Sequence, residues 1–109
     1  MYEKTVNEII NVLAKSKNKS NTIEEIISKS LNSLKKNKKI IFCGNGGSAS
    51  DGSHMVAELV GKFNLERRPL RSISLNDNMP IITSVANDYD YSKVFSRQIE
   101  AYGDDNDVL

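Results

Sequence analysis

Residues 39–63, KIIFCGNGGSASDGSHMVAELVGKF, constrain the fold of this chain more than any other segment. The stretch begins with a predicted strand at residues 39–43, which is apolar from Ile40 onward. It then passes through a glycine-rich turn at residues 44–47 and continues with the periodicity of an amphipathic helix. A strand that leads through such a turn into a helix collects free backbone N–H groups at one point, which attracts anions. The sequence therefore predicts either a phosphate or polyol site at this turn or, with equal weight, a purely structural turn.

The composition is that of a globular protein without a strong net charge. The 109 residues include 15 basic and 14 acidic residues, for a net charge of +1, and 39% are hydrophobic. Balanced charge argues against a nucleic-acid-binding face, and no apolar run reaches the roughly 20 residues of a membrane span. One cysteine fits a reducing compartment, and the N-terminus MYEKTVNEII lacks the pattern of a signal peptide. We therefore expect a cytoplasmic protein that binds neither nucleic acid nor membrane.

Two helices are predicted before the glycine turn. Apolar spacing predicts one helix over residues 3–16 and a second from an N-cap at Asn21 to about Lys36, with Glu24 at the capping-box position. The polar run at residues 15–20 should separate the two. The lysines that crowd the end of the second helix suit the helix dipole, and a patch for an acidic partner is the weaker alternative.

Strands and helices alternate after the turn. We expect a helix over about residues 50–63, a strand over residues 70–75, a helix that begins near Pro80 and a last helix over residues 91–102. The final residues, Asp-Val-Leu, look like the opening of a third strand, whose backbone groups would lack partners at a natural end. We therefore expect the chain to be the N-terminal part of something longer.

This alternation predicts an α/β fold, namely a three-layer parallel sheet with flanking helices that is truncated after the start of the third strand. In such sheets, ligands bind beyond the carboxyl ends of the strands. The glycine turn and the polar loop at residues 76–78 each follow a predicted strand. Both should lie at the same edge of the sheet.

The only histidine, His54, and Glu58 stand four residues apart on the predicted central helix and share a face, which Asp51 extends toward the turn. One interpretation is a surface pair worth about 0.3 kcal/mol. If a cleft desolvates Glu58, that carboxylate could act as a general base. The pair could also give two ligands to zinc, with the others coming from another segment or subunit.

Three other residues have ambiguous roles. Cys43 could be a nucleophile, but without a second histidine it is better explained as a small buried residue at a strand end. Asn87 and Asp88 could bind a sugar hydroxyl or could equally form a turn that terminates a helix.

Taken together, these motifs resemble a known family. The segments CGNGGSASDGSHMVAELVGKF, SVANDYDYSKVFSRQIEAYG and DVL look like those of the bacterial phosphoheptose isomerases, which are sugar-isomerase (SIS) domain proteins. The family converts sedoheptulose 7-phosphate to D-glycero-D-manno-heptose 7-phosphate, a precursor for lipopolysaccharide or capsule. The resemblance implies a flavodoxin-like SIS domain, with residues 1–36 as N-terminal helices and residues 37–109 as the start of the α/β core.

The resemblance also implies roles for individual residues. Glu58 matches the family's catalytic glutamate, which moves a proton between the first two carbons of the sugar through an enediol, with His54 beside it in the catalytic site. His54 and Glu58 also match two ligands of a zinc ion found in some members, one per active site. The implied substrate-binding residues are Asn45, Gly46, Gly47, Ser48, Glu58, Asn87 and Asp88. Family members are homotetramers with active sites between subunits.

The chain departs from the family pattern at a few points. Lys62 stands where arginine is usual and Gly52 where alanine is common, and Gly52 should weaken the helix by up to about 1 kcal/mol. The family's phosphate-holding loop, glutamine and second histidine come later than Asp-Val-Leu. We therefore expect the intact protein to be the isomerase and these 109 residues alone to be inactive. The alternatives are a non-enzymatic SIS protein that binds the bacterial replication initiator and a SIS protein for another sugar phosphate.

Overall fold

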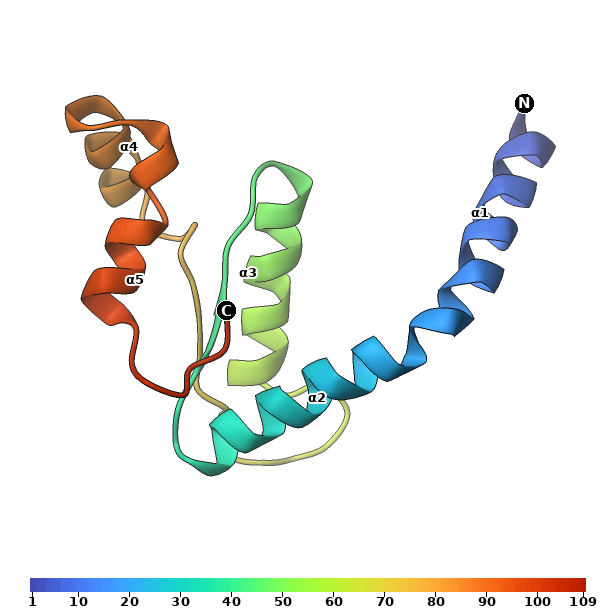
Figure 1. The fold of residues 1–109 in the computed structure, drawn as a ribbon, viewed down its shortest axis with the longest axis horizontal. Coiled ribbons are helices and arrows are strands. Elements are labelled where there is room, and N and C mark those ends of the chain that lie inside the picture. Colours follow the sequence, from blue (N-terminus) through green and yellow to red (C-terminus); the bar gives the residue numbers. More distant parts are fainter. The chain divides into compact units, whose positions relative to one another are not determined.

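The computed structural model describes all 109 residues, which form two compact units. The helical unit, Met1–Leu31, contains α1 (Tyr2–Ser16), the 3-10 helix η1 (Lys17–Lys19) and most of α2 (Ser20–Lys35). The α/β unit, Asn32–Leu109, contains the end of α2 and then β1 (Ile40–Phe42), α3 (Gly47–Val60), β2 (Ser72–Ser74), α4 (Met79–Asp88), η2 (Tyr91–Lys93) and α5 (Ser96–Tyr102) (Figure 1).

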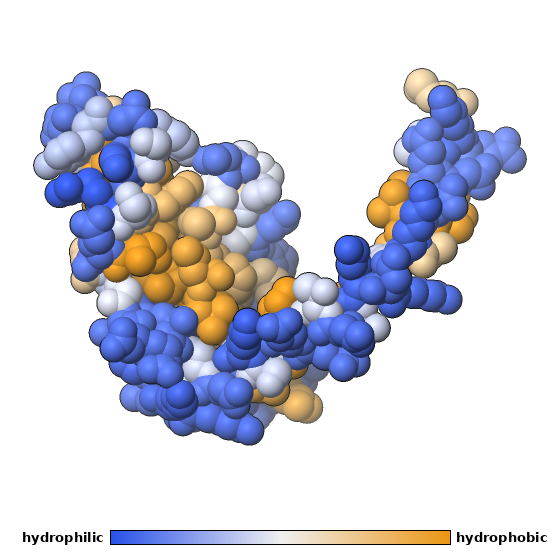
Figure 2. Space-filling model, viewed as in Figure 1, coloured by the Kyte–Doolittle hydropathy of each residue, from blue (hydrophilic) through white to orange (hydrophobic).

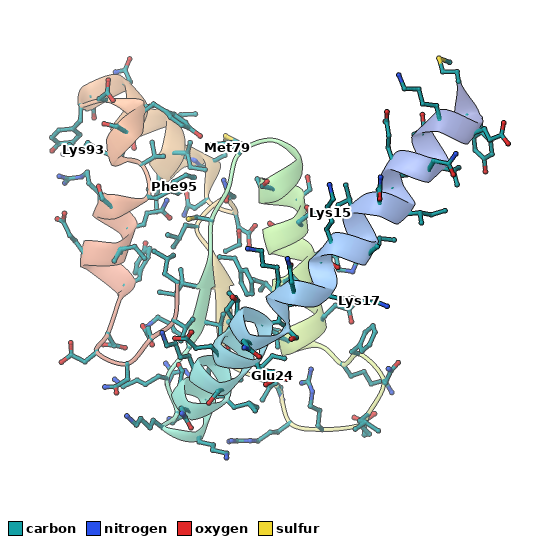
Figure 3. The ribbon with its side chains drawn as sticks, turned by 45° about the vertical axis from the view of Figure 1, so that its right-hand side comes forward. Lys15, Lys17, Glu24, Met79, Lys93 and Phe95 are labelled. Carbon is teal, nitrogen blue, oxygen red and sulfur yellow. The ribbon has the colours of Figure 1, made fainter.

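The polar run between the first two helices does not interrupt the helical backbone. Lys17 and Ser20 both have right-handed helical angles, so η1 joins α1 directly to α2. The predicted N-cap at Asn21 is wrong, because α2 already begins at Ser20. A run of Lys, Asn and Ser contains neither glycine nor proline, and these residues cost a helix only a few tenths of a kcal/mol each. Lys15 and Lys17 project from this continuous segment (Figure 3).

The apolar stripe of the helical unit lies on its surface. No residue of α1 is buried, and Figure 2 shows apolar side chains along this helix. Seven large apolar side chains of this unit are each at least 50% exposed: Ile9, Ile10, Leu13, Ile23, Ile26, Ile27 and Leu31. A one-sided stripe of this kind needs another surface to bury it. The helical unit therefore has no core of its own in this chain.

The α/β unit is built on a parallel sheet with β1 in the middle. β1 pairs with β2 so that Ile40 lies opposite Ser72 and Phe42 opposite Ser74. On the other side of β1, Ile40 pairs in parallel with Val108, whose carbonyl accepts a hydrogen bond from the Ile41 N–H at 2.7 Å. The predicted opening of a third strand is therefore confirmed, as is the α/β fold class.

Helices cover both faces of this sheet. Successive residues of a strand point to opposite faces, and Phe42 meets α3 while Ile41 shares a shallow cavity with Ile99 of α5. On the α5 side, Leu75 and Val94 are almost completely buried, and the Gln98 amide donates to both of their carbonyl oxygens at 2.9 Å. Figure 2 shows apolar side chains gathered between α3 and α5, near the C-terminus.

Gly52 allows α3 to approach the sheet closely. It is the buried residue of α3, and a Cβ atom at this position would lie 3.2 Å from the Cβ of Phe42. The sequence predicts only a weakened helix at Gly52. The structure gives a compensating reason for the glycine, because a larger side chain would push α3 away from β1.

Several predicted boundaries are wrong. α3 runs from Gly47 to Val60 rather than over residues 50–63, because Gly46 with a φ of 57° starts the helix early and Gly61 ends it. α4 continues through Asp88, so the residues predicted to form a turn after it are partly helical. The helix predicted over residues 91–102 is divided into η2 and α5. None of the helices is both long enough and apolar enough to cross a membrane.

Lys39 anchors the turn at the C-terminal end of the chain. Its Nζ lies 2.7 Å from Asp107 and 3.1 Å from Asp104, and its backbone N–H donates to Asp107 at 2.9 Å. The side chains of Lys39 and Asp107 are only 10% and 7% exposed. This lysine is therefore committed to an internal ion pair and is not part of a patch for an acidic partner.

This ion pair predicts a defined pH dependence of stability. The hydrogen bond to Asp107 raises the pKa of Lys39, and the hydrogen bond from Lys39 lowers the pKa of Asp104. Burial raises the pKa of Asp107, but the hydrogen bonds from Lys39 and Asp104 outweigh it and leave that pKa below 3.8. The carboxylates therefore stabilise the fold above about pH 4 and lose this effect as the pH falls through their folded pKa values. Lys39 contributes its full share to the stability of the fold below pH 10.5. This contribution is lost as the pH rises through the higher pKa of Lys39 in the folded state.

We expect Asp107→Asn to lower the free energy of unfolding by about 2 kcal/mol at pH 7, between the values for exposed and enclosed ion pairs. The difference from wild type should persist from pH 5 to 10 and shrink below about pH 4, as measured by urea unfolding. The matched control is Glu25→Gln, which breaks an exposed pair with Lys29 at 2.8 Å and should change nothing measurable. Equal effects of the two substitutions would contradict a structural role for the Lys39 pair.

Candidate functional site

The carboxyl edge of the sheet brings the two polar loops together. The glycine turn follows β1, and residues 76–78 follow β2. The Asn76 side chain joins the loops, since its Oδ1 accepts from the Gly44 N–H at 3.0 Å and its Nδ2 donates to the Gly44 carbonyl at 2.8 Å. The expectation that these loops share one edge is confirmed.

The glycine turn is tight and opens directly into α3. A Cβ atom at Gly44 would lie 2.8 Å from the backbone of Ser48, and Gly46 has a φ of 57°, which side chains with a Cβ rarely adopt. Gly46 is also the N-cap of α3 and offers no side-chain cap. The N–H groups of residues 48–50 donate to backbone carbonyl oxygens at 3.1–3.3 Å, whereas the Gly47 N–H makes no such bond. The Gly47 N–H is therefore the donor at the start of the helix that remains available to an anionic or hydroxyl-bearing ligand.

Asn45 is held by a residue of η2. Its Oδ1 accepts a hydrogen bond from the Tyr91 hydroxyl. The Tyr91 ring packs edge to face against Phe95, with centroids 6.5 Å apart, and Phe95 is labelled in Figure 3. The sequence did not mark Tyr91 or Asn76 as site residues. The only signals were their places beside polar turns that end predicted elements.

His54 and Glu58 are in contact on α3. His54 Nε2 lies 3.2 Å from Glu58 Oε1, and the side chains are 73% and 33% exposed. Glu58 also lines a shallow, mainly apolar cavity of about 270 Å³ with Met55, Leu59, Phe63 and Arg67. Met55 and Phe63 are 47% and 69% exposed. The carboxylate is therefore half-buried beside exposed apolar surface.

Arg67 fixes the end of the helix that carries Glu58. Its Nη2 donates to the Glu58 carbonyl at 2.7 Å, and its Nη1 donates to the Leu59 carbonyl at 2.9 Å and the Gly61 carbonyl at 3.3 Å. These carbonyls form the negative end of the helix dipole, where a cation is stabilising. Arg67 therefore acts as a C-terminal cap for α3.

Replacement of Arg67 by methionine should lower the free energy of unfolding by about 1–2 kcal/mol, because several helix carbonyls lose a charged donor. Urea unfolding measures the change. The neighbouring Arg68 provides the control, since its exposed side chain makes no hydrogen bond or ion pair in the structure and Arg68→Met should be neutral. An equal loss in both variants would show that the cap contributes nothing specific.

The remaining predicted site residues lie on the surface. Ser48 is exposed, and its N–H donates to the Asn45 carbonyl at 3.1 Å. Asn87 and Asp88 end α4 and are hydrogen-bonded to each other at 3.0 Å. No hydrogen bond joins Asn87 or Asp88 to the glycine turn or to the pair on α3, so their predicted role in binding a sugar hydroxyl stays a prediction.

The donor set on α3 fits part of a zinc site. His54 and Glu58 present an imidazole nitrogen and a carboxylate oxygen, which are both zinc ligands in proteins. The chain contains no group of three His, Cys, Asp or Glu residues that could hold a metal ion. It therefore supplies at most two ligands for a tetrahedral site.

Cys43 is exposed, so the prediction that it is a small buried residue is wrong. β1 ends at Phe42, and the chain then leaves the sheet toward the glycine turn. The burial that we expected for the whole apolar run therefore ends at Phe42, one residue earlier than predicted.

A family model for the SIS domain matches residues 1–109. The chain belongs to the SIS domain family. Its relatives include the phosphoheptose isomerase of Helicobacter pylori, which is 53% identical over 79 residues that cover 72% of this chain and 41% of the relative. The phosphoheptose isomerase of Clostridium acetobutylicum is 46% identical over 87 residues, covering 80% of this chain and 44% of the relative. The chain thus spans less than half the length of these relatives.

Solved structures agree with this assignment. The phosphoheptose isomerase GmhA from Neisseria gonorrhoeae superposes on 100% of this chain with a TM-score of 0.77 and 30% identity. A phosphoheptose isomerase from Francisella tularensis covers 98% of this chain with a TM-score of 0.82 and 27% identity. In both cases the match extends over 59% of the solved chain. The resemblance expected from the motifs is therefore confirmed.

Proposed function

We propose that the native protein containing this chain is an isomerase that interconverts sedoheptulose 7-phosphate and D-glycero-D-manno-heptose 7-phosphate. The observation that carries this proposal is the contact between His54 and Glu58 at 3.2 Å on the helix that opens at the glycine turn. Curated relatives at 46–53% identity over this region are phosphoheptose isomerases, which supports the same reading.

The proposed reaction moves hydrogen between the first two carbons of the sugar. Glu58 takes a proton from C1 of the ketose while O2 gains one, which gives an enediol. Glu58 then returns a proton to C2 while O1 loses one, which gives the aldose. His54 holds the Glu58 carboxylate in place. Loss and gain of protons balance, so the reaction needs no external oxidant or reductant.

We propose that Asn45, Gly46, Gly47 and Ser48 bind the sugar through the backbone N–H groups and polar side chains of the turn, with Asn87 and Asp88 contacting hydroxyl groups. His54 and Glu58 would provide two ligands for one zinc ion per active site. When bound, zinc would supply a Lewis acid that polarises the sugar oxygens. The two donor types on one helix face support this part of the proposal.

We also propose that the native protein works in the cytoplasm as a homotetramer and supplies heptose for lipopolysaccharide or capsule. The exposed apolar stripe along α1 and α2 supports an assembly, because such a surface needs a partner. In this proposal residues 1–109 are the N-terminal part of a single SIS domain. Binding to a replication initiator is not favoured, because the relatives at this level of identity are isomerases.

The test is an isomerase assay on the native protein in D2O with sedoheptulose 7-phosphate. NMR should show formation of the aldose with deuterium at C2, as expected for proton transfer through an enediol. Fructose 6-phosphate is the control for another sugar phosphate and should react far more slowly. Preference for that control would support the alternative SIS function, and absence of both turnover and deuterium exchange would contradict an isomerase.

A further inference from the structure

We propose that Asn76 is a positioning residue for the substrate turn. In this inference, which rests on the proposed function, the Asn76 carboxamide fixes the backbone of Gly44 and thereby the direction in which Asn45, Gly46 and Gly47 face the sugar. Asn76 itself does not touch the substrate. The inference adds a residue from the loop after β2 to a site otherwise built on the turn and α3.

The first argument is the completeness of the contact. Both polar groups of the Asn76 side chain are used on both backbone groups of Gly44, at 3.0 and 2.8 Å. The backbone ladder between β1 and β2 ends one step earlier, where the Leu75 N–H donates to the Phe42 carbonyl at 2.8 Å. The Asn76 side chain therefore continues the ladder beyond its last backbone pair and satisfies groups that would otherwise be unpaired.

The second argument is that Asn76 is itself held in place. Its N–H donates to the Ser74 hydroxyl at 3.2 Å. That hydroxyl lies 3.3 Å from the hydroxyl of Ser53, which donates to Asp77 at 2.8 Å. Ser53 directly precedes His54 on α3. The network therefore ties the Asn76 loop both to the glycine turn and to the helix of the proposed catalytic pair.

The third argument is that the turn has little freedom once Gly44 is fixed. Gly44 lies so close to Ser48 that a Cβ atom would be 2.8 Å from its backbone, and the Tyr91 hydroxyl donates to the Asn45 side chain. Without Asn76, the hydrogen bond from the Tyr91 hydroxyl to Asn45 is the remaining side-chain contact that holds the turn from another element. The N–H groups that face the ligand would then be presented over a range of directions, and small misplacements of binding groups are costly.

The experiment compares Asn76→Leu, which keeps the approximate shape but has no hydrogen-bonding groups, with wild type in the native protein. We expect KM for sedoheptulose 7-phosphate to rise at least about tenfold, with a smaller change in kcat. Amide hydrogen exchange at Gly44 should also become faster. Asn76→Ala serves as a second variant if the leucine does not fold.

The matched control is Asn78→Leu in the same loop. Asn78 caps α4 by accepting from the Ile81 N–H at 3.1 Å and does not contact the turn. Its replacement should reduce stability but leave KM and exchange at Gly44 unchanged. A wild-type KM in both Asn76 variants would overturn this inference and leave the proposed function standing. A wild-type protein without turnover would overturn the proposed function and this inference with it.

Discussion

Replacement of Glu58 by glutamine in the native protein should lower kcat for sedoheptulose 7-phosphate by about 1,000-fold. Glutamine has nearly the same shape and can still contact His54, which lies 3.2 Å from the carboxylate. It cannot take up and return a proton, so the transfer between C1 and C2 loses its carrier. Because the turn and its N–H groups are unchanged, KM should change much less than kcat.

The control for this substitution is Glu66→Gln. Glu66 pairs with Lys62 at 2.8 Å on the exposed surface and belongs to none of the proposed binding groups. The Glu66→Gln substitution should leave both kcat and KM unchanged. Zinc content should be measured in the Glu58 variant, since inactivity with zinc retained assigns the loss to the base rather than to the metal. Activity close to wild type in Glu58→Gln would remove Glu58 from the mechanism.

Gly44→Ala should lower the free energy of unfolding by about 2–3 kcal/mol. The new Cβ would lie 2.8 Å from the backbone carbon of Ser48 and 2.9 Å from its carbonyl oxygen. Backbone atoms at the start of a helix cannot move aside as a flexible side chain would. The turn would therefore have to shift, together with its hydrogen bonds to Asn76.

Gly47→Ala is the matched control within the same turn. Nothing lies within 4 Å of a Cβ at Gly47, and this residue has no positive φ and is the first of α3. Alanine there should raise the free energy of unfolding by about 0.5 kcal/mol, because it restricts the unfolded chain and suits a helix. Urea unfolding of both variants decides the point. Equal destabilisation by the two alanines would show that the close approach at Gly44 is unimportant.

The sequence was sufficient to predict which loops share an edge, because parallel strands with helical connections place their carboxyl ends together. It was not sufficient to predict that Asn76 meets Gly44. That contact follows from the register, in which Phe42 lies opposite Ser74, so residues two positions further along each strand also lie opposite each other. Strands of three residues carry too little pattern to fix a register.

Helix boundaries and burial were harder to predict for a related reason. The start of α3 depends on the positive φ of Gly46, which composition alone does not reveal. The apolar stripes were recognised correctly as stripes, but Ile26 is 56% exposed and Phe63 is 69% exposed. Hydrophobic periodicity shows which side of a helix needs a partner and says nothing about where that partner comes from.

The central position of β1 has a consequence for the order of folding. β1 meets β2 through contacts that close about 30 residues, whereas the bond from Lys39 to Asp107 joins residues 68 positions apart. The entropy of closing a loop grows with its length, and the long closure gains the Lys39 cluster, two backbone hydrogen bonds to Val108 and a side-chain bond from Lys36 to Asn106. We therefore expect the β1–β2 unit with α3 to form before the Val108 strand docks, which stopped-flow folding of the Asp107→Asn variant would check. Damage to the Lys39 pair then mainly speeds unfolding and leaves the rate of folding almost unchanged.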